Sequence, residues 1–343
     1  MDKYWSERAE ASMNKGVVTT EAMLKKMLRE YNAIAKLIQK EIEAFIGRYA
    51  EQTGLTITEV HKLLTKPELA DFREAIKEYA ETASQISNGP VSKYYRDKLD
   101  RLSTRINISR LQALEASLDD YIIQLGIKEE TAVKEVLGTV YESTYYNILY
   151  DLDKYQGYGV PVNAVNTKAI DTVLKEQWVG SNYSDRIWTN KAKLIEQLNT
   201  TFLRGVVADR DAVTIAKEMS KNLGVSFYNC KRLCVTEMAH ILETATLTGY
   251  RERGVKKYRI LAVLDTKTSD ICQAMDGKIF KITEAVEGIT YPPFHPNCRT
   301  TTIPEIEDYD DSGDVRFARD KYGRGIEVPL SMTYKEWYDK FIK

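Results

Sequence analysis

Three side chains that commonly bind soft metal ions lie in one loop-rich segment towards the end of the sequence. Cys272 begins this group, and His295 and Cys298 follow within the run Pro-Pro-Phe-His-Pro-Asn-Cys. A histidine and a cysteine three positions apart can reach one ion, and Cys272 would approach it from the other arm of the loop. Thiolate and imidazole groups are the usual ligands of structural zinc. The spacing therefore makes this segment a candidate zinc site.

The pattern leaves the fourth ligand and two other interpretations open. Structural zinc usually has four protein ligands, and Asp265, Asp276 or Cys234 could supply the missing one. The same thiols and imidazole could instead pack in a small hydrogen-bonded loop. A disulfide between Cys272 and Cys298 is the third alternative. It is disfavoured because the N-terminus lacks the features of a secretory signal, and we expect a cytoplasmic chain with reduced thiols.

A small α+β module is expected to position this loop. Residues 256–264 and 299–304 are rich in aliphatic and β-branched side chains and predict two strands on either side of the loop. A helix over 226–253 is expected to precede the first strand. Together these elements predict a module over residues 225–305.

Long amphipathic helices are predicted for the N-terminal part. Apolar side chains recur at steps of three and four over 21–52, 92–125 and 128–152, with Gly54 and Gly126 as expected stops. Thr56, followed three residues later by Glu59, fits a capping box, and Thr65 with Pro67 near the first turn predicts a second helix start. The fold class is therefore mainly α: a long-helix bundle over 1–155 with a small α+β Cys/His-loop module towards the C-terminus.

Glycines and prolines suggest how the rest of the chain is divided. The stretch 156–161 contains two glycines and a proline, and we expect a helical connecting region over 156–224. Its helices are predicted at 167–179, 186–206 and 211–222, with Gly224 as a stop before 226–253. Residues 306–343 are expected to form an acidic linker and an aromatic tail that covers the protein's own core.

Composition excludes several classes of function. The formal net charge is −1, so binding to nucleic acid through a generally basic surface is not indicated. One local exception is the basic stretch that contains Lys93, Arg96, Arg101 and Arg105, which could contact DNA phosphates or be a solvated helix face. No run approaches the ~20 apolar residues of a membrane-spanning helix. Phosphate-binding loops and the usual hydrolase motifs are missing as well, so we expect no enzyme.

The loop also matches a longer pattern. It reads Asp-x-x-Thr-Ser-x-x-Cys, then Asp-Gly, then Pro-Pro-x-His-Pro-Asn-Cys-Arg. The matching residues are Asp265, Thr268, Ser269, Cys272, Asp276, Gly277, Pro292, Pro293, His295, Asn297, Cys298 and Arg299. With Thr236 and Glu237 in the preceding helix, this segment resembles the phage Mu F-like head morphogenesis, or minor head, proteins of tailed phages. Many of these proteins carry a further cysteine where this chain has Thr300.

The resemblance implies a minor capsid protein of a tailed phage or prophage that acts in head assembly near the portal. Its expected partners are the portal protein and a scaffold or major capsid protein, with non-specific contact to double-stranded DNA and passage with the DNA at ejection as further options. The expected location is the virion, after assembly in the host cytoplasm. A metal-dependent nuclease, or another DNA-processing enzyme that uses the Cys/His loop, is the alternative.

Overall fold

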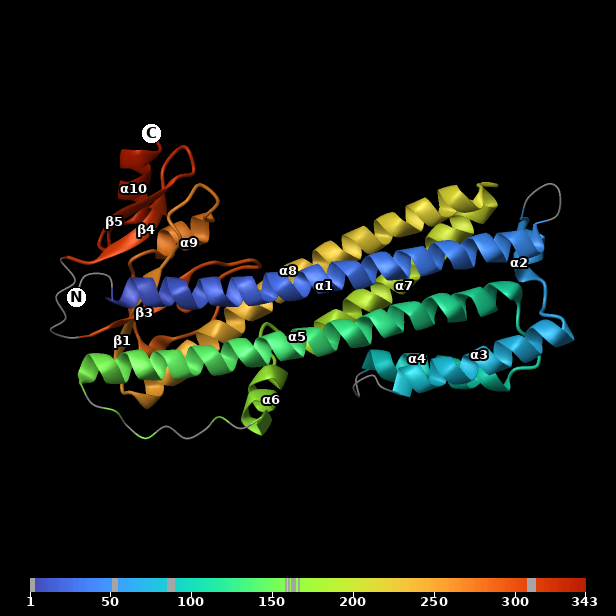
Figure 1. Cartoon of the computed structure of the whole chain (residues 1–343), viewed down its shortest axis with the longest axis horizontal. Helices are drawn as coiled ribbons and strands as arrows, with labels where there is room; N and C mark the ends of the chain where they lie inside the picture. The colour runs from blue at the N-terminus through green and yellow to red at the C-terminus, as the bar shows by residue number, and fades with distance from the viewer. Residues whose placement is uncertain are drawn as a thin grey trace. The chain divides into compact units, whose positions relative to one another are not determined.

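The computed structural model describes residues 4–50, 55–84, 90–157, 159, 161, 165, 167–306 and 313–343. These residues form two compact units, and neither is a continuous stretch of chain. Unit 1 comprises Met1–Ala22, Lys134–Leu174 and Arg232–Lys343, and unit 2 comprises Met23–Val133 and Lys175–Lys231. The division into four consecutive domains, which the sequence suggested, remains a prediction. Figure 1 labels the elements in chain order.

The structure confirms a mainly helical fold with a small α+β region. The helices are α1 Tyr4–Tyr49, α2 Ile57–His61, α3 Lys66–Ser84, α4 Pro90–Thr104, α5 Arg110–Gln156, α6 Thr167–Lys175, α7 Tyr183–Val207, α8 Ala212–Glu252, α9 Asp270–Met275 and α10 Tyr334–Phe341. The strands are β1 Lys257–Leu261, β2 Ile279–Lys281, β3 Thr301–Glu305, β4 Val315–Arg319 and β5 Gly325–Pro329, and a 3₁₀ turn, η1, covers Ile282–Glu284.

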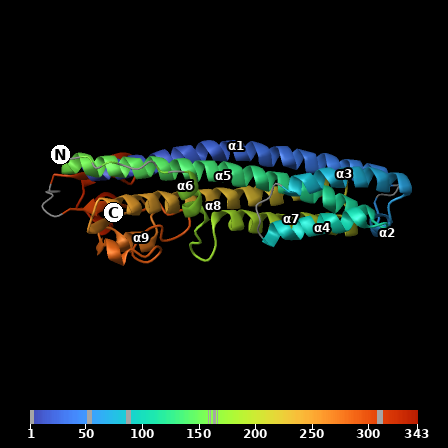
Figure 2. The same ribbon diagram turned by 90° about the horizontal axis from the view of Figure 1, so that it is seen from below.

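Unit 2 is built on the predicted apolar stripes. In α1, the side chains of Ile34, Ile38 and Ile42 are buried at helical spacing. The ring of Phe45 continues the stripe and meets Phe202 of α7 edge to face, with their centroids 5.6 Å apart. The helices α3 and α4 form a hairpin, and Figure 2 shows α4 beside α7.

A buried polar network joins the helices of unit 2. Lys191 on α7 lies 2.6 Å from a carboxylate oxygen of Glu129 on α5, and both side chains are almost fully buried. Tyr31 on α1 donates a hydrogen bond of 2.8 Å to the same carboxylate. Because removing one member would leave a buried charge unpaired, the network favours one register of the three helices.

Two predicted helix stops are wrong. Helix α5 runs through Gly126, where a Cβ atom would come within 2.7 Å of the Trp188 ring, so this glycine permits close helix packing. Helix α8 runs through Gly224, where a Cβ atom would meet nothing within 4 Å. A mid-helix glycine costs only about 1 kcal/mol relative to alanine, which a helix of 41 residues with a buried face can offset.

The chain turns between α4 and α5, rather than at Gly126 as the sequence predicted. Leu63 and Ser109 form an isolated antiparallel β-bridge, and the Leu64 amide donates to the Ile108 carbonyl at 2.7 Å. Ser109 and Gln112 then cap α5 reciprocally, with bonds of 3.2 and 3.0 Å. This capping box was not predicted from the sequence.

The helix starts expected at Thr56 and Thr65 are present. The Thr56 hydroxyl accepts from the Glu59 amide at 3.3 Å, and the Thr65 amide donates to Glu68 at 2.7 Å. Several other predicted features lie outside the described residues: Gly54, Tyr158 and Val160 at the proposed boundary, and 307–312 of the acidic stretch.

Unit 1 contains the α+β region. The two predicted strands are present as β1 and β3, which pair antiparallel with Arg259 opposite Ile303. Strand β2 was not predicted, and it completes a sheet of order β2-β1-β3. Figure 1 shows these strands beside the first turns of α1 and the last turns of α5 and α8, and the buried side chains of Trp5, Leu152 and Tyr250 belong to the same core.

The last residues form more structure than a linker and a tail. Strands β4 and β5 make an antiparallel hairpin, and α10 follows it. As expected, the tail covers its own core, because Tyr334 and Trp337 pack in a cluster with Leu264, Ala318 and Val328. Asp314, at the end of the acidic stretch, is buried rather than solvated.

Candidate metal centre

Local structure fixes the two arms of the Cys/His loop. Cys272 lies in the first turn of α9, whose N-cap Ser269 accepts from the Cys272 amide at 3.4 Å. Gly277 follows α9 with a φ of 75°, a backbone conformation that glycine adopts without strain. On the other arm, the Cys298 amide donates to the His295 carbonyl at 3.1 Å, so these two residues form one turn before β3.

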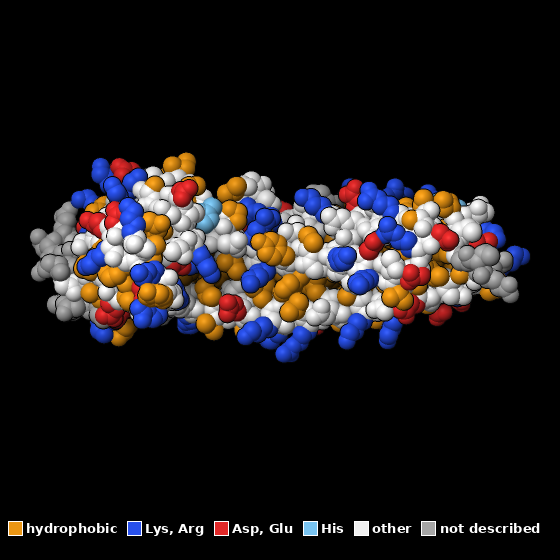
Figure 3. All heavy atoms as spheres, turned by 90° about the horizontal axis from the view of Figure 1, so that it is seen from above, with side chains coloured by type: hydrophobic (Ala, Val, Ile, Leu, Met, Phe, Trp, Pro, Cys, Tyr) orange, Lys and Arg blue, Asp and Glu red, His pale blue; other side chains and the backbone are white. Residues whose placement is uncertain are grey.

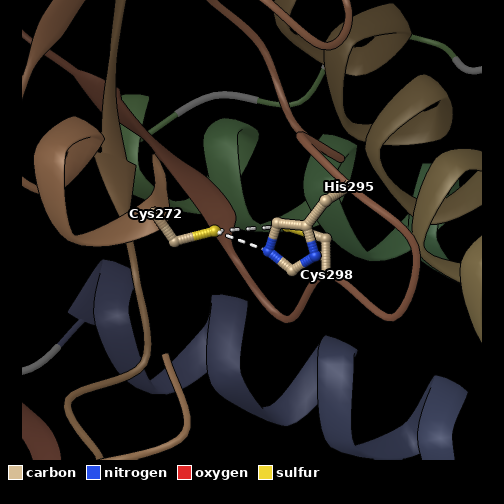
Figure 4. A group of neighbouring side chains, drawn as sticks. All are labelled: Cys272, His295 and Cys298. Atoms are coloured by element: carbon tan, nitrogen blue, oxygen red, sulfur yellow. Dashed lines mark hydrogen bonds between the residues drawn. The ribbon is translucent and has the colours of Figure 1, made fainter. Parts of the chain in front are cut away.

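The predicted ligands Cys272, His295 and Cys298 meet in this structure. The Sγ atom of Cys272 lies 3.2 Å from Nε2 of His295 and 3.7 Å from Sγ of Cys298. All three ligand atoms lie within 4.8 Å of one another (Figure 4). Both thiols are buried, and the imidazole is half-buried. The group could therefore hold a metal ion.

Hydrogen bonds fix the orientation of the imidazole. Nδ1 of His295 lies 2.8 Å from the Pro296 carbonyl, which can only accept, so Nδ1 carries the proton. Nε2 then presents its lone pair towards the thiols, and the Ser269 hydroxyl donates to it at 2.7 Å. An imidazole whose other nitrogen donates to a carbonyl is the common arrangement of a metal-ligating histidine.

The two thiols influence each other's ionisation. A hydrogen bond from Cys298 lowers the pKa of the Cys272 thiol, and the same interaction raises the pKa of Cys298. The pair therefore gives up its first proton easily and retains the second. Because the thiolate is the form that binds metal, this coupling favours a site that is partly ready for an ion at neutral pH.

The suggested fourth ligands are not part of the group. Asp265 accepts two bonds from Arg299, at 2.6 and 2.8 Å. Although burial raises the pKa of Asp265, the hydrogen bonds and charge of Arg299 outweigh that effect and lower it. Asp276 is paired with Arg316, and Cys234 is buried on α8. Within the described residues, the group thus has three protein ligands.

Hydroxyl groups surround the Cys272 thiol instead. The hydroxyls of Ser269 and Thr300 contribute to lowering its pKa. At this position the resemblance described above implies a cysteine, and the chain has Thr300. A cysteine there would bring another thiol to the same group.

Helix α8 holds the loop through three side chains at helical spacing. The Thr236 hydroxyl accepts from the Asn297 amide at 3.0 Å, and Nδ1 of His240 lies 2.5 Å from Glu287. Glu243 accepts from the hydroxyls of Thr301 and Thr302, at 2.5 and 3.2 Å. Glu237 is also buried on this helix. Thr236 was identified from the motif, whereas the roles of His240 and Glu243 were missed.

Glu243 makes the stability of unit 1 depend on pH. Burial raises the pKa of Glu243 to about 8, against the smaller opposite effect of its hydrogen bonds. The folded state therefore keeps a proton that the unfolded chain releases near pH 4.5. We expect the free energy of unfolding to fall by a few kcal/mol as pH rises from about 4.5 to about 8, and to level off above.

Glu243→Gln tests this prediction, because glutamine resembles the neutral acid and cannot ionise. Chemical denaturation between pH 5 and pH 9 should show a flatter profile for this variant than for the wild type. Glu284→Gln, at an exposed position of the same module, should keep the wild-type profile. An unchanged pH dependence in Glu243→Gln would show that Glu243 is ionised throughout.

A buried ion pair connects the loop to the hairpin. Asp276 accepts from Arg316 of β4 at 2.9 and 3.0 Å, and both side chains are almost completely buried. The same carboxylate accepts from the amides of Ala262 and Tyr334, at 2.9 and 3.0 Å. Asp276 therefore ties together the end of β1, strand β4 and the first turn of α10.

The remaining motif residues shape the loop. The Thr268 hydroxyl donates to the Val263 carbonyl, and the Thr268 carbonyl accepts from Gln273 at 2.7 Å. Pro293 follows a cis peptide bond, and Asn297 has a φ of 60°. These residues hold the two arms of the loop in place.

The candidate DNA contacts belong to unit 2. Lys93 and Arg101 are exposed on α4, Arg96 is half-buried, and Arg105 is exposed just beyond the end of the helix. The neighbouring Lys98 pairs with Asp119 at 2.5 Å. Figure 3 shows one face of the molecule, on which basic and acidic side chains are intermixed.

Comparison with known proteins agrees with the motif. The family described as Phage Mu protein F like protein matches residues 196–303, which run from α7 to β3. No curated protein and no solved structure matches the chain significantly. Among the described residues, no helix combines the length and apolar character needed to cross a membrane. The resemblance is therefore confirmed: residues 196–303 are similar to the phage Mu protein F-like family.

Proposed function

We propose that this chain is a minor capsid protein of a tailed phage or prophage, and that its Cys/His loop is a structural zinc centre. The match over residues 196–303 carries the proposed role in the head. Its partners are then the portal protein and a scaffold or major capsid protein, and its location is the virion near the portal vertex. Contact with double-stranded DNA through Lys93, Arg96, Arg101 and Arg105 belongs to the same proposal.

The donor set supports zinc. In a tetrahedral site with Zn–S bonds of ~2.3 Å and Zn–N bonds of ~2.0 Å, two sulfurs lie ~3.8 Å apart and a sulfur and a nitrogen ~3.5 Å apart. The corresponding distances are 3.7 Å between the two thiols and 3.2 Å between Cys272 and His295. Small side-chain movements would suffice to admit an ion. The bound ion would then hold α9 against the turn before β3.

A nuclease is the second candidate, because three protein ligands leave one coordination position for water, as in catalytic zinc sites. Hydrolysis also needs a base that activates this water. Asp265 and Asp276, the two carboxylates of the loop motif, are both held by arginines. The hydroxyls of Ser269 and Thr300 next to Cys272 are poor bases. These features favour a structural role.

The two candidates differ in the expected behaviour of His295→Ala. The structural role predicts no DNA hydrolysis by the wild type with Mg²⁺, Mn²⁺ or Zn²⁺, and a lower stability or reduced incorporation into particles for the variant. His61→Ala, at an exposed position of unit 2, is the matched control and should behave as the wild type. Cleavage by the wild type that disappears in a folded His295→Ala variant would establish the nuclease instead.

A further inference from the structure

A basic cleft opens in unit 1 beside the Cys/His loop. It has a volume of about 340 Å³ and is formed by two stretches of chain. One wall contains Asp265, Thr266, Lys267 and Arg299 from the loop. The other contains Arg319, Asp320, Lys321 and Gly323 from the turn between β4 and β5. The cleft therefore has four basic side chains and two acidic ones.

Both carboxylates of the cleft are already neutralised. Arg299 binds Asp265 through two parallel hydrogen bonds, at 2.6 and 2.8 Å. Asp320 accepts from the side chain of Arg324 at 2.8 Å and from the amides of Tyr322 and Arg324. Neither carboxylate is therefore available to balance another charge.

Three cations of the cleft are left without a carboxylate. Lys267 and Lys321 are exposed, and Arg319 donates to the Gly323 carbonyl at 3.0 Å. In the described part of the chain, none of these three side chains forms an ion pair. Arg299 also uses only two of its five N–H donors on Asp265. The cleft thus combines excess positive charge with free hydrogen-bond donors.

The two walls are held in fixed relation to each other. The Arg319 amide donates to the Leu264 carbonyl at 3.0 Å, and Leu264 forms a parallel bridge with Ala318. The indole of Trp337 donates to the Arg319 carbonyl at 3.0 Å. The Lys267 amide is bound by Asp265 at 2.9 Å. A cleft with a fixed backbone loses little conformational entropy when an anion enters it.

From this arrangement we propose that the cleft binds phosphate groups. Phosphate oxygens accept several charge-assisted hydrogen bonds at once, and arginine and lysine are their usual protein partners. The bound phosphate group belongs either to the backbone of a nucleic acid or to a free phosphate ion. The site is distinct from the basic residues of α4, and its existence does not depend on the role in head assembly.

The test uses the full-length chain and a fluorescently labelled DNA duplex of about 20 base pairs, a length chosen to cover several phosphates on each strand. Lys267→Ala/Lys321→Ala removes two charges from the cleft without leaving a buried group unpaired. Lys278→Ala/Lys281→Ala removes two charges from exposed positions elsewhere in the module and is the matched control. Inorganic phosphate is added as a competitor at constant ionic strength.

We expect the cleft variant to bind the duplex roughly tenfold more weakly than the wild type, with the slope of log affinity against log salt reduced by about two. The control should stay within about twofold of the wild type. If millimolar phosphate displaces the duplex from the wild type, the cleft takes free phosphate as well. If phosphate has no effect, the nucleic-acid backbone is the ligand.

Three results would overturn the proposal. One is a cleft variant that binds the duplex as tightly as the wild type or no more weakly than the control. Another is complete loss of binding in Lys93→Ala/Arg101→Ala while the cleft variant is unaffected, because the contact would then lie on α4. The third is a wild-type chain that binds neither the duplex nor phosphate.

Discussion

Cys298→Ser is expected to abolish zinc binding and to lower the stability of unit 1 by several kcal/mol. The wild type should contain close to one zinc per chain when prepared without chelator. In small zinc peptides the ion contributes ~10–16 kcal/mol to folding, and this module has other contacts that keep part of its structure. Elemental analysis gives the zinc content, and chemical denaturation with and without chelator gives the loss of stability.

Cys234→Ser is the matched control, because Cys234 is also a buried thiol of unit 1 but lies outside the group of three. It should keep its zinc and lose stability only through the buried hydroxyl. Less than a tenth of an equivalent of zinc in the wild type, together with no effect of Cys298→Ser on stability, would show that the loop is simply a packed, metal-free turn.

Asp276→Ala is expected to have the second large effect, a loss of about 3–5 kcal/mol, because it leaves the buried Arg316 without its partner. The amides of Ala262 and Tyr334 lose their acceptor at the same time. Chemical denaturation followed by tryptophan fluorescence would measure the loss, since Trp337 lies in the core that this ion pair supports.

Asp270→Ala provides the comparison for Asp276→Ala. It removes an exposed carboxylate from the first turn of α9 and should cost at most about 1 kcal/mol. Equal, small losses for the two variants would mean that Arg316 finds water or another acceptor when Asp276 is removed. The ion pair would then not be what ties the hairpin to the loop.

Periodicity and capping predicted much of the helical fold. The stripe through Ile34, Ile38 and Ile42 is buried as expected, and Thr56 and Thr65 cap their helices. Both features depend on residues only a few positions apart, so they can be predicted from the sequence alone. The β1 and β3 strands were predicted for the same reason, because each is a short run of aliphatic and β-branched residues.

Glycine was the main source of error among the helices. A glycine can end a helix or permit close packing within it, and the neighbour that decides comes from elsewhere in the chain. At Gly126 that neighbour is Trp188, 62 positions later in the sequence. The β4–β5 hairpin was missed because its strands are short and partly exposed, and their burial depends on contact with α10.

The candidate site shows the same contrast between features that the local sequence predicts and features that depend on distant contacts. Cys272, His295 and Cys298 were identified because their residue types and spacing are specific, and the structure brings them together. Asp265 was suggested as a ligand from residue type alone, and its partner Arg299 could not be deduced from spacing. The support from Glu243 and Arg316 depends on contacts over 40 or more positions, for which the sequence has no local signal.

The content of purified particles is the most direct test of the proposed role in the phage head. Phage particles from cells that encode this chain would be separated on a density gradient, and the chain quantified against the major capsid protein with isotope-labelled peptides. We expect the full-length chain to sediment with the particles at a constant ratio of a few copies per head. Its absence from the particles, with all of it in the unassembled fraction, would contradict a structural role in the capsid.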